Sequence, residues 1–283
     1  MNPPDTRNFS FEFFPPKTDD GRAKLRSTAG ELAALSPAFA SVTFGAGGTA
    51  RDGTLDAVLM LRELGLSVAP HLSCVGSTRD ALRLLLAEYR ARDVRRIVAL
   101  RGDMPSGWGE IGELRHANEL VEFIRAETGD WFHIEVAAYP ETHPQAKSPR
   151  DDLTRFVDKV RAGADSAITQ YFYNADAYFR FVDAVRAAGV DVPIVPGIMP
   201  ITNYTQLARF SDACGAEIPR WLRLALASHG DDLASLRAFG LDVVTALCER
   251  LVAGGAPGLH FYTLNGAQAS AEIWRRLGLA RQR

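Results

Sequence analysis

Polar side chains that could do chemistry follow several apolar runs of the sequence. Glu12 lies in FSFEFF, between Phe11 and Phe13, and Phe14 follows. Aromatic neighbours would remove water from this carboxylate, raise its pKa and favour the protonated form. A carboxyl group that is protonated near neutral pH can act as a general acid. The alternative is a structural ion pair with an arginine inside the fold.

Arg101, Gly102 and Asp103 end the apolar run RRIVAL. The glycine would let the backbone approach a ligand, the arginine could grip a phosphate, and the aspartate could accept a hydrogen bond or steady a cation. A salt-bridged strand end explains the same residues equally well. The glycine cluster GAGG, residues 45–48, favours a tight turn over a phosphate cradle.

The other candidates are less specific. His71 and His143 could each contact a ligand or be hydrogen-bonded structural residues. Tyr171, Phe172 and Tyr173 favour packing in the core over stacking on a planar ligand. The chain has neither metal-ligand spacing nor the nucleophile elbow G-x-S-x-G, so we predict no metal site and no serine hydrolase.

Eight apolar runs are the elements that must position these residues. Most show little polar alternation, which is typical of parallel strands buried on both faces. The predicted strands are residues 8–14, 39–45, 67–73, 95–102, 133–140, 166–173, 192–198 and 259–265.

Helical periodicity fills the intervals between the predicted strands. Residues 78–92 and 231–253 carry leucines at helical spacing. Ser148, followed by Pro149 and Asp151, predicts the N-terminus of a helix. Ser77, with Asp80 three residues later, predicts another.

Eight strands that alternate with helices predict an α/β fold, a single (β/α)8 TIM barrel over residues 1–283. The long interval 199–258 predicts extra helices between strands seven and eight. An open, doubly wound sheet is the alternative, but the chain lacks G-x-G-x-x-G after a strand. In a barrel the active site lies at the carboxyl ends of the strands, where the polar candidates occur.

Composition limits the class of protein. A formal charge of −2 indicates no nucleic-acid or anionic membrane partner. Three cysteines without a C-x-x-C pair indicate reduced thiols. The first residues lack the pattern of a secretory signal, and we find no apolar run of membrane-spanning length. We therefore expect a cytoplasmic enzyme.

Eight segments together resemble the methylenetetrahydrofolate reductase family in its short bacterial form. The resemblance runs from about residue 8 to the C-terminus, and FEFFPP, ALRGD and AAYPE-x-H are its most specific motifs. Longer eukaryotic members carry a regulatory domain after the barrel, so we expect one catalytic domain and no S-adenosylmethionine control. The segments are FSFEFFPPKT, VTFGAGG, PHLSC, IVALRGD, VAAYPETHPQAKS, AITQYFY, PGIMPI and HFYTLN.

The resemblance implies a cofactor and a reaction. FAD is held without a covalent bond, NAD(P)H reduces it and leaves, and methylenetetrahydrofolate then takes the hydride to become 5-methyltetrahydrofolate. This ping-pong cycle feeds methionine synthesis. NADH is the expected donor by family habit, although the sequence does not distinguish it from NADPH. Relatives form dimers or tetramers, so a homo-oligomer is expected.

The resemblance also assigns roles to residues. Glu12 matches the proton donor that opens the folate ring, and Asp103 matches the group that stabilises the cationic intermediate. Gln170 and Leu226 match folate-binding positions, as do Glu12 and Asp103 themselves. The flavin contacts map to Thr43, Phe44, Ala46, His71, Arg101, Gly102, Asp103, His116, Ala117, Tyr139, His143, Asp152 and Lys159.

Four positions depart from the relative used for this mapping. Phe44 replaces a tyrosine, and Arg155 replaces an asparagine at a flavin contact. Leu226 replaces a phenylalanine, and Gly266 replaces an arginine that touches folate. These changes bear on affinity for flavin and folate. Two alternatives remain: another flavin barrel oxidoreductase of the proline-dehydrogenase-like type, and an inactive flavin-free homologue that acts as a subunit.

Overall fold

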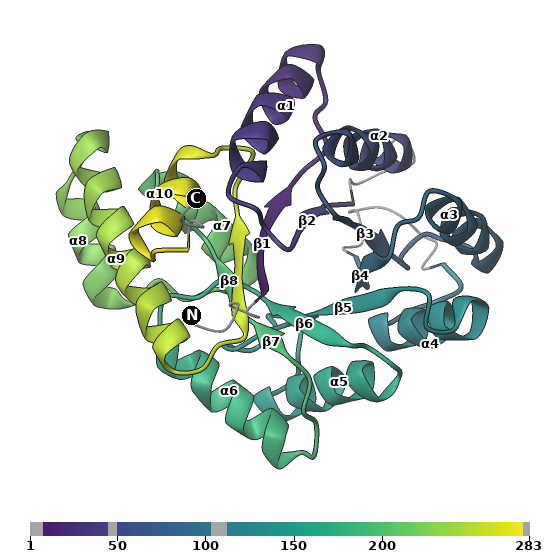
Figure 1. Cartoon of the computed structure of the whole chain (residues 1–283). Coiled ribbons are helices and arrows are strands. Elements are labelled where there is room, and N and C mark those ends of the chain that lie inside the picture. Colours follow the sequence, from purple (N-terminus) through teal and green to yellow (C-terminus); the bar gives the residue numbers. More distant parts are fainter. Residues whose placement is uncertain (1–7, 45–49, 103–111, 280–283) are drawn as a thin grey trace, which may run out of the picture.

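The protein folds as a barrel of parallel strands surrounded by helices (Figure 1). The computed structural model describes residues 8–44, 50–102 and 112–279. The order of hydrogen-bonded neighbours is β7-β6-β5-β4-β3-β2-β1-β9-β8. The strands are β1 (Asn8–Phe13), β2 (Phe39–Val42), β3 (Val68–Ser73), β4 (Arg96–Leu100), β5 (His133–Ala138), β6 (Ser166–Thr169), β7 (Ile194–Val195), β8 (Gly197–Ile198) and β9 (Gly258–Tyr262).

The barrel closes through one interrupted strand. The sequence predicts a single seventh strand over residues 192–198, but the structure divides it into β7 and β8 at Pro196. Pro196 has no N–H to donate to a ladder. β7 pairs with β6, whereas β8 pairs with β9, so the two ends of the sheet meet at this proline. The predicted α/β TIM barrel is therefore confirmed, with nine short strands in place of eight.

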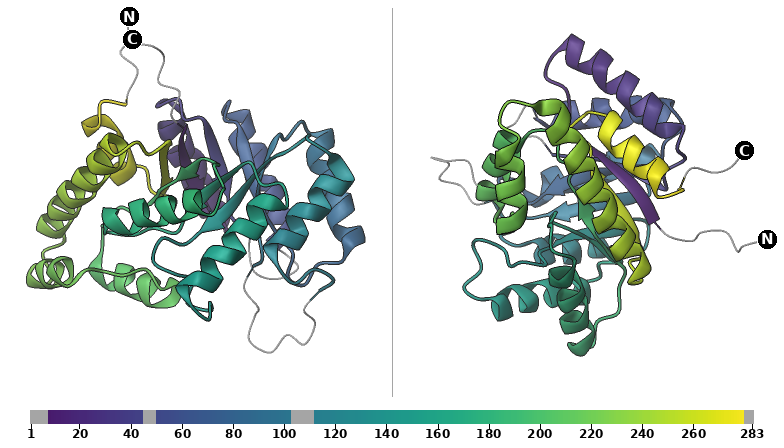
Figure 2. Two further views of the ribbon diagram at one scale, coloured as in Figure 1. Left: turned by 90° about the horizontal axis from the view of Figure 1, so that it is seen from below. Right: turned by 90° about the vertical axis from the view of Figure 1, so that its left-hand side faces the viewer.

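Helices cover the outside of the barrel, and the two views of Figure 2 show α8 and α9 together at one side. The predicted extra helices between the last two predicted strands are confirmed as α7, α8 and α9. The helices are α1 (Asp19–Ala33), α2 (Ala50–Glu63), α3 (Arg79–Ala91), α4 (Ala117–Thr128), α5 (Pro149–Arg161), α6 (Ala175–Ala187), α7 (Tyr204–Cys214), α8 (Arg220–Ser228), α9 (Leu233–Ala253) and α10 (Gln268–Arg276).

The two predicted helix starts differ in outcome. Ser148 caps α5 as predicted, and its side chain accepts a hydrogen bond from the N–H of Asp151 at 3.1 Å. The prediction for Ser77 is wrong, because Thr78 caps α3 and accepts from the N–H of Ala81. The Ser77 hydroxyl instead donates to the carbonyl of Ser73, so it belongs to the preceding turn.

Apolar side chains fill two regions. A small cluster of Phe39, Ala69, Val98 and Ile168 lies on the strands, apart from the main core. The main core joins the strands to the surrounding helices and includes Tyr171, Phe172 and Tyr173 as expected. No described helix is both long and apolar enough to cross a bilayer.

We expect Ser148→Ala to lower the free energy of unfolding by about 1 kcal/mol, because the first turn of α5 loses its side-chain acceptor. Ser148→Asn keeps an acceptor and should stay close to the wild type. Urea unfolding monitored by circular dichroism measures both variants. Equal losses in the two would show that the cap does not stabilise α5.

Candidate active site

Glu12 faces the barrel interior because β1 alternates apolar and polar residues. Phe9 and Phe11 point outward and contact Trp274 of α10, with ring centroids 5.5 and 5.0 Å apart. Ser10 and Glu12 therefore lie on the opposite, inner face. This strand departs from the expected lack of alternation, and the departure is what brings a carboxylate inside.

Side chains from three other strands surround this carboxylate. Oε2 of Glu12 lies 3.3 Å from Nε2 of His71 on β3 and 3.5 Å from Nε2 of His260 on β9. Ser41 on β2 donates a hydrogen bond to the same oxygen at 3.4 Å. Behind His260, its Nδ1 lies 2.7 Å from the hydroxyl of the fully buried Ser10. One carboxylate oxygen thus meets two imidazoles and one hydroxyl.

The expectation of a raised pKa for Glu12 is wrong. Burial does raise the pKa of this carboxyl, as the aromatic neighbours suggest, but the hydrogen bond from His260 and charge attraction from both His71 and His260 outweigh burial. The balance lowers the pKa of Glu12 to about 2. The carboxylate is therefore ionised at neutral pH, and its partners are imidazoles in place of the arginine considered from the sequence.

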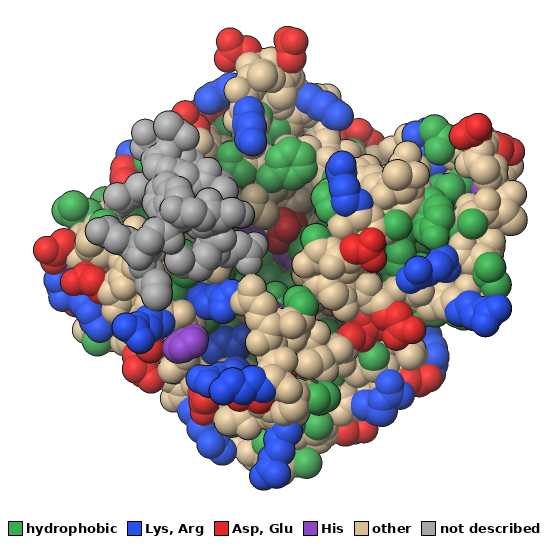
Figure 3. Space-filling view, turned by 180° about the vertical axis from the view of Figure 1, so that it is seen from behind, with side chains coloured by type: hydrophobic (Ala, Val, Ile, Leu, Met, Phe, Trp, Pro, Cys, Tyr) green, Lys and Arg blue, Asp and Glu red, His purple; other side chains and the backbone are tan. Residues whose placement is uncertain are grey.

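A cavity of about 340 Å³ opens beside Glu12 at the carboxyl ends of the strands. The face seen in Figure 3 is hollowed near its centre, with an acidic side chain and a histidine at the bottom. We call this cavity the glutamate cavity. Its polar lining includes Glu12, His71, Gln170, Tyr171 and Tyr262. Its apolar lining includes Phe14, Leu100, Ile168 and Met199.

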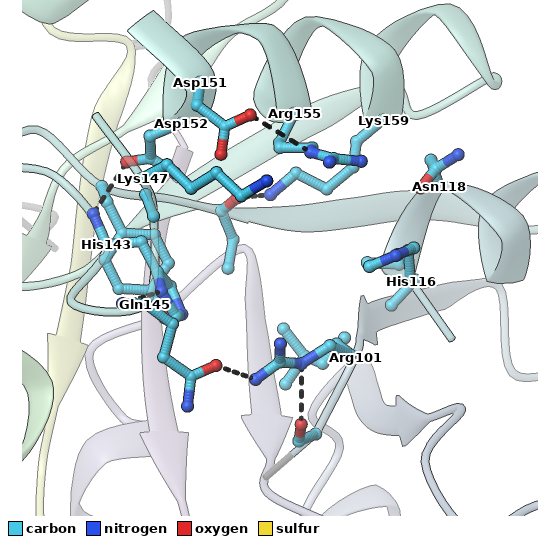
Figure 4. Close-up of a pocket in the computed structure, with 17 residues that line it drawn as sticks. Arg101, His116, Asn118, His143, Gln145, Lys147, Asp151, Asp152, Arg155 and Lys159 are labelled. Atoms are coloured by element: carbon cyan, nitrogen blue, oxygen red, sulfur yellow. Dashed lines mark hydrogen bonds and ion pairs between the residues drawn. The ribbon is translucent and has the colours of Figure 1, made fainter. Parts of the chain in front are cut away.

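A second cavity of about 380 Å³ adjoins the first, and we call it the basic cavity (Figure 4). The two share Leu100, Ala137 and Tyr139, so they lie side by side at the same end of the barrel. Four cationic side chains line the basic cavity, together with two aspartates and two histidines. These are Arg101, Lys147, Arg155, Lys159, Asp151, Asp152, His116 and His143.

The cations of the basic cavity are only partly neutralised by its aspartates. Asp151 lies 3.7 Å from Arg155, and Asp152 accepts a hydrogen bond from the backbone N–H of His143 at 2.8 Å. Lys159 donates to the carbonyl of Ala137. Burial lowers the pKa of Lys159 to about 8, although nearby Asp152 raises it. The lysine is still mostly protonated at neutral pH, so the cavity favours an anion.

Backbone geometry adds to this preference. α4 begins beside the basic cavity at His116 and Ala117, and the His116 side chain makes no capping hydrogen bond. A helix N-terminus of this kind attracts phosphate groups.

Gly102 has a φ of +85°, and a Cβ added there would lie 1.9 Å from the Ser73 hydroxyl. A larger residue would therefore not fit at this strand end.

His71 has an unsatisfied ring nitrogen. Its Nε2 is buried and makes no hydrogen bond with the described atoms, although it lies close enough to Glu12 for charge attraction. Buried polar atoms rarely lack a partner. Because His71 lines the glutamate cavity, a ligand in that cavity would be in a position to supply one.

The structure brings most predicted site residues to these two cavities. Glu12, His71 and Gln170 line the glutamate cavity, and Tyr139 lines both cavities. Thr43 and Phe44 directly follow β2, at the same end of the barrel. Leu226 is buried in the core and lines neither cavity. The basic cavity is lined by Arg101, Gly102, His116, Ala117, His143, Asp152 and Lys159. Ala46 and Asp103 lie outside the described residues.

Sequence reasoning missed His260, Ser10 and Ser41. A signal for the first two was present, since polar and apolar residues alternate in FSFEFF and LHFY as in a strand with one polar face. The register pairs Ser10 with His260 and Glu12 with Ser41, and register is set by the folded sheet. The sequence therefore contains the residues but not their contacts.

Two residues that follow β9 hold the end of β1 in place. The Thr263 hydroxyl donates to the carbonyl of Glu12 at 2.6 Å. The side chain of Asn265 accepts from the N–H of Phe14 and donates to its carbonyl, at 3.0 and 2.9 Å. Thr263 and Asn265 thus position the segment that carries the carboxylate.

We expect Gly102→Ala to lower the free energy of unfolding by about 1–3 kcal/mol, because alanine must adopt a left-handed backbone and displace Ser73. Gly266→Ala is the matched control, since its Cβ would lie 3.5 Å from the nearest atom and its φ is not positive. Chemical unfolding compares the two. Equal stabilities would contradict the close packing of Gly102 against β3.

Comparison with known proteins finds a matching family and several similar relatives. Residues 3–278 match the family model described as methylenetetrahydrofolate reductase. The chain is 41% identical over 273 residues to the 5,10-methylenetetrahydrofolate reductases of Salmonella typhimurium and Escherichia coli, covering 96% of this chain and 91% of each relative.

More distant matches cover the same barrel. Methylenetetrahydrofolate reductase (NADH) 1 of Arabidopsis thaliana is 38% identical over 285 residues, which are 96% of this chain and 48% of the plant protein. A solved protein from Clostridium thermocellum, described as binding two copies of 5-methyl-5,6,7,8-tetrahydrofolic acid, superposes with a TM-score of 0.64 at 20% identity. It covers 98% of this chain and 94% of its own, and this likeness shows the fold.

Proposed function

Because the chain belongs to the methylenetetrahydrofolate reductase family, we propose that it reduces 5,10-methylenetetrahydrofolate to 5-methyltetrahydrofolate with electrons from NAD(P)H carried by FAD. Its curated relatives are oxidoreductases of that name. The observation that carries the proposal is the buried Glu12 carboxylate at the base of a cavity that lies beside a basic one. The reaction would supply the methyl group for methionine synthesis.

The residues present fit FAD. Arg101, Lys147, Arg155 and Lys159 offer positive charge for its diphosphate, and the start of α4 offers backbone N–H groups. The buried Nε2 of His71 makes no hydrogen bond with the described atoms, and a ligand would supply one. When bound, FAD would supply two-electron transfer between the nicotinamide nucleotide and the folate. The mapped contacts at Thr43, Phe44, Ala46 and Asp103 rest on the family resemblance.

Glu12 supplies the proton for folate ring opening. Its O–H bond breaks, and an N–H bond forms at the departing nitrogen of the five-membered ring. The bond from this nitrogen to the bridging carbon breaks and leaves its electron pair on the nitrogen. The carbon becomes part of an iminium cation, which is the form that accepts a hydride. The ionised Glu12 that remains lies near this cation and stabilises it by charge attraction.

Other residues orient the substrate. Gln170 lines the glutamate cavity, and its Oε1 accepts a hydrogen bond from the N–H of Tyr171 at 3.0 Å. This contact fixes the amide so that its NH₂ group is the end available to a ligand. Phe14, 43% exposed at the same cavity, offers an aromatic surface for a flat ring.

The cavity also supports alternating occupation by the two substrates. Its volume of about 340 Å³ lies at the lower end of the range for a single small-molecule site. Nicotinamide and folate would therefore enter in turn, which is the ping-pong order. The names of the plant relatives favour NADH as the donor, and the folate bound by the Clostridium thermocellum protein favours a folate acceptor on this fold.

We expect Glu12→Gln to leave reduction of the flavin by NADH within about 3-fold of the wild type, because that half-reaction needs no proton from Glu12. Reoxidation by methylenetetrahydrofolate should fall by at least about 100-fold, since glutamine cannot donate the proton. Anaerobic stopped-flow absorbance of the flavin measures each half-reaction separately. Glu31→Gln, at an exposed position of α1, serves as the control.

Two outcomes would count against this role of Glu12. Equal losses in both half-reactions would make the residue structural. Full activity with methylenetetrahydrofolate in Glu12→Gln would exclude it as the proton donor.

We expect Lys159→Met to weaken FAD binding by about 10-fold or more, because a charge-assisted contact to phosphate is lost. Arg161→Met removes a charge elsewhere on α5 and should change the affinity little. In the wild type the affinity should fall as pH rises through about 8, where free Lys159 loses its proton. Fluorescence titration with FAD measures the affinity of Lys159→Met, of Arg161→Met and of the wild type as a function of pH. An unchanged affinity in Lys159→Met would remove the lysine from the cofactor site.

A further inference from the structure

The lowered pKa of Glu12 leaves open where the proton for ring opening is held. With a pKa of about 2, the carboxylate alone carries almost no proton at neutral pH. A general acid must nevertheless be protonated when the substrate reacts. While a ligand fills the cavity and limits access of solvent, a neighbouring group in contact with Glu12 is the source of this proton that the structure offers.

Only some of the groups around Glu12 are suited to give it a proton. Burial, and the charge of Glu12 itself, raise the pKa of Tyr262, so this phenol keeps its proton. The ring of Phe39 lies between Arg96 and His260. Its centroid is 4.5 Å from Cζ of Arg96 and 6.0 Å from the centroid of the His260 ring, so Arg96 does not contact His260 directly. Among the described residues, His71 and His260 are the titratable groups within 3.5 Å of the carboxylate.

The two histidines differ in their surroundings. His71 lines the glutamate cavity, so a bound ligand will contact it. His260 is fully buried and does not line that cavity. Its Nε2 contacts Glu12 and Ser41 at 3.5 and 3.4 Å, and its Nδ1 contacts Ser10 at 2.7 Å. His260 is therefore placed to exchange a proton with Glu12 while the cavity is occupied.

Ser10 suits this exchange because its hydroxyl oxygen can accept a hydrogen bond from Nδ1. When His260 is cationic, its Nδ1–H donates to the oxygen of Ser10. After Nε2 has given up its proton, the neutral ring keeps its hydrogen on Nδ1 and still donates to Ser10. Both protonation states of the buried ring are thus hydrogen-bonded, which avoids the penalty for an unsatisfied polar atom.

We propose that His260 is a positioning residue that holds, on Nε2, the proton that Glu12 passes to the folate. The inference rests on the proposed function. The N–H bond at Nε2 of His260 breaks and an O–H bond forms on Glu12. This O–H bond then breaks as an N–H bond forms at the folate nitrogen, which leaves Glu12 ionised and His260 neutral. After product leaves, water in the open cavity returns a proton to the pair through Glu12.

The main test compares His260→Gln with the wild type. Glutamine keeps a hydrogen-bonding group but cannot hold the extra proton. We expect flavin reduction by NADH to stay within about 3-fold and folate reduction to fall about 10- to 100-fold near neutral pH. The midpoint of the pH profile for folate reduction should move down by about one pH unit or more, because Glu12 must then be protonated from solvent.

The other end of the barrel offers a matched control. There His133 lies 3.4 Å from Glu135 and 2.6 Å from Ser166, which is a similar histidine, carboxylate and serine group away from both cavities. His133→Gln should leave both half-reactions and the pH profile unchanged. A purely structural role for His260 would lower the rate in His260→Gln without moving the midpoint of its pH profile, and that outcome would overturn the proposal.

A second measurement on the wild-type protein tests the proposal even if His260→Gln fails to fold. Nitrogen-15 NMR of histidine-labelled wild-type protein, assigned with Ser10→Ala and His260→Gln, reports which ring nitrogens carry hydrogen. We expect both nitrogens of His260 to be protonated in the resting enzyme at neutral pH. A neutral His260 would overturn the proposal. A wild-type protein that fails to reduce methylenetetrahydrofolate would instead refute the proposed function, so the two failures are distinguishable.

Discussion

A charged carboxylate inside an apolar barrel is the constraint on which the site depends. Removing a carboxylate from water is costly, and in proteins the penalty amounts to several kcal/mol unless it is offset by partners. Here the partners come from three other strands: His260 on β9, His71 on β3 and Ser41 on β2. These partners meet the carboxylate only while the barrel is closed, so fold and chemistry are coupled. Its free side faces the glutamate cavity, where a substrate would meet it.

The two cavities differ in their charge and polarity. The basic cavity carries partly unpaired cations and a helix N-terminus, which suit phosphate groups. The glutamate cavity is mostly apolar, with Glu12, His71 and Gln170 as convergent polar groups. A long cofactor that is charged at one end and flat and apolar at the other matches this division. The shared Tyr139, whose ring lies 4.5 Å from that of His143, lines both cavities.

Much of this arrangement follows from the sequence. The eight apolar runs and the long interval 199–258 predict the barrel and its added helices, because period and length are local properties. The carboxyl ends of the strands also indicate the side on which Glu12, Arg101 and Gln170 gather. The pKa of Glu12 could not be predicted, since its direction depends on whether burial or the contacts of His260 and His71 are stronger. Those contacts join residues about 250 and 60 positions apart, and only the register of the closed sheet brings them together. The break at Pro196 likewise depends on which neighbour each half-strand meets.

The central claim is that the buried carboxylate and its imidazoles serve the reduction of a folate one-carbon unit. The most direct test is product analysis of the purified, FAD-loaded protein under anaerobic conditions with NADH and 5,10-methylenetetrahydrofolate. We expect one 5-methyltetrahydrofolate to appear, by chromatography, for each NADH consumed. Oxidation of NADH without formation of 5-methyltetrahydrofolate would contradict this claim and leave a flavin barrel with a different acceptor.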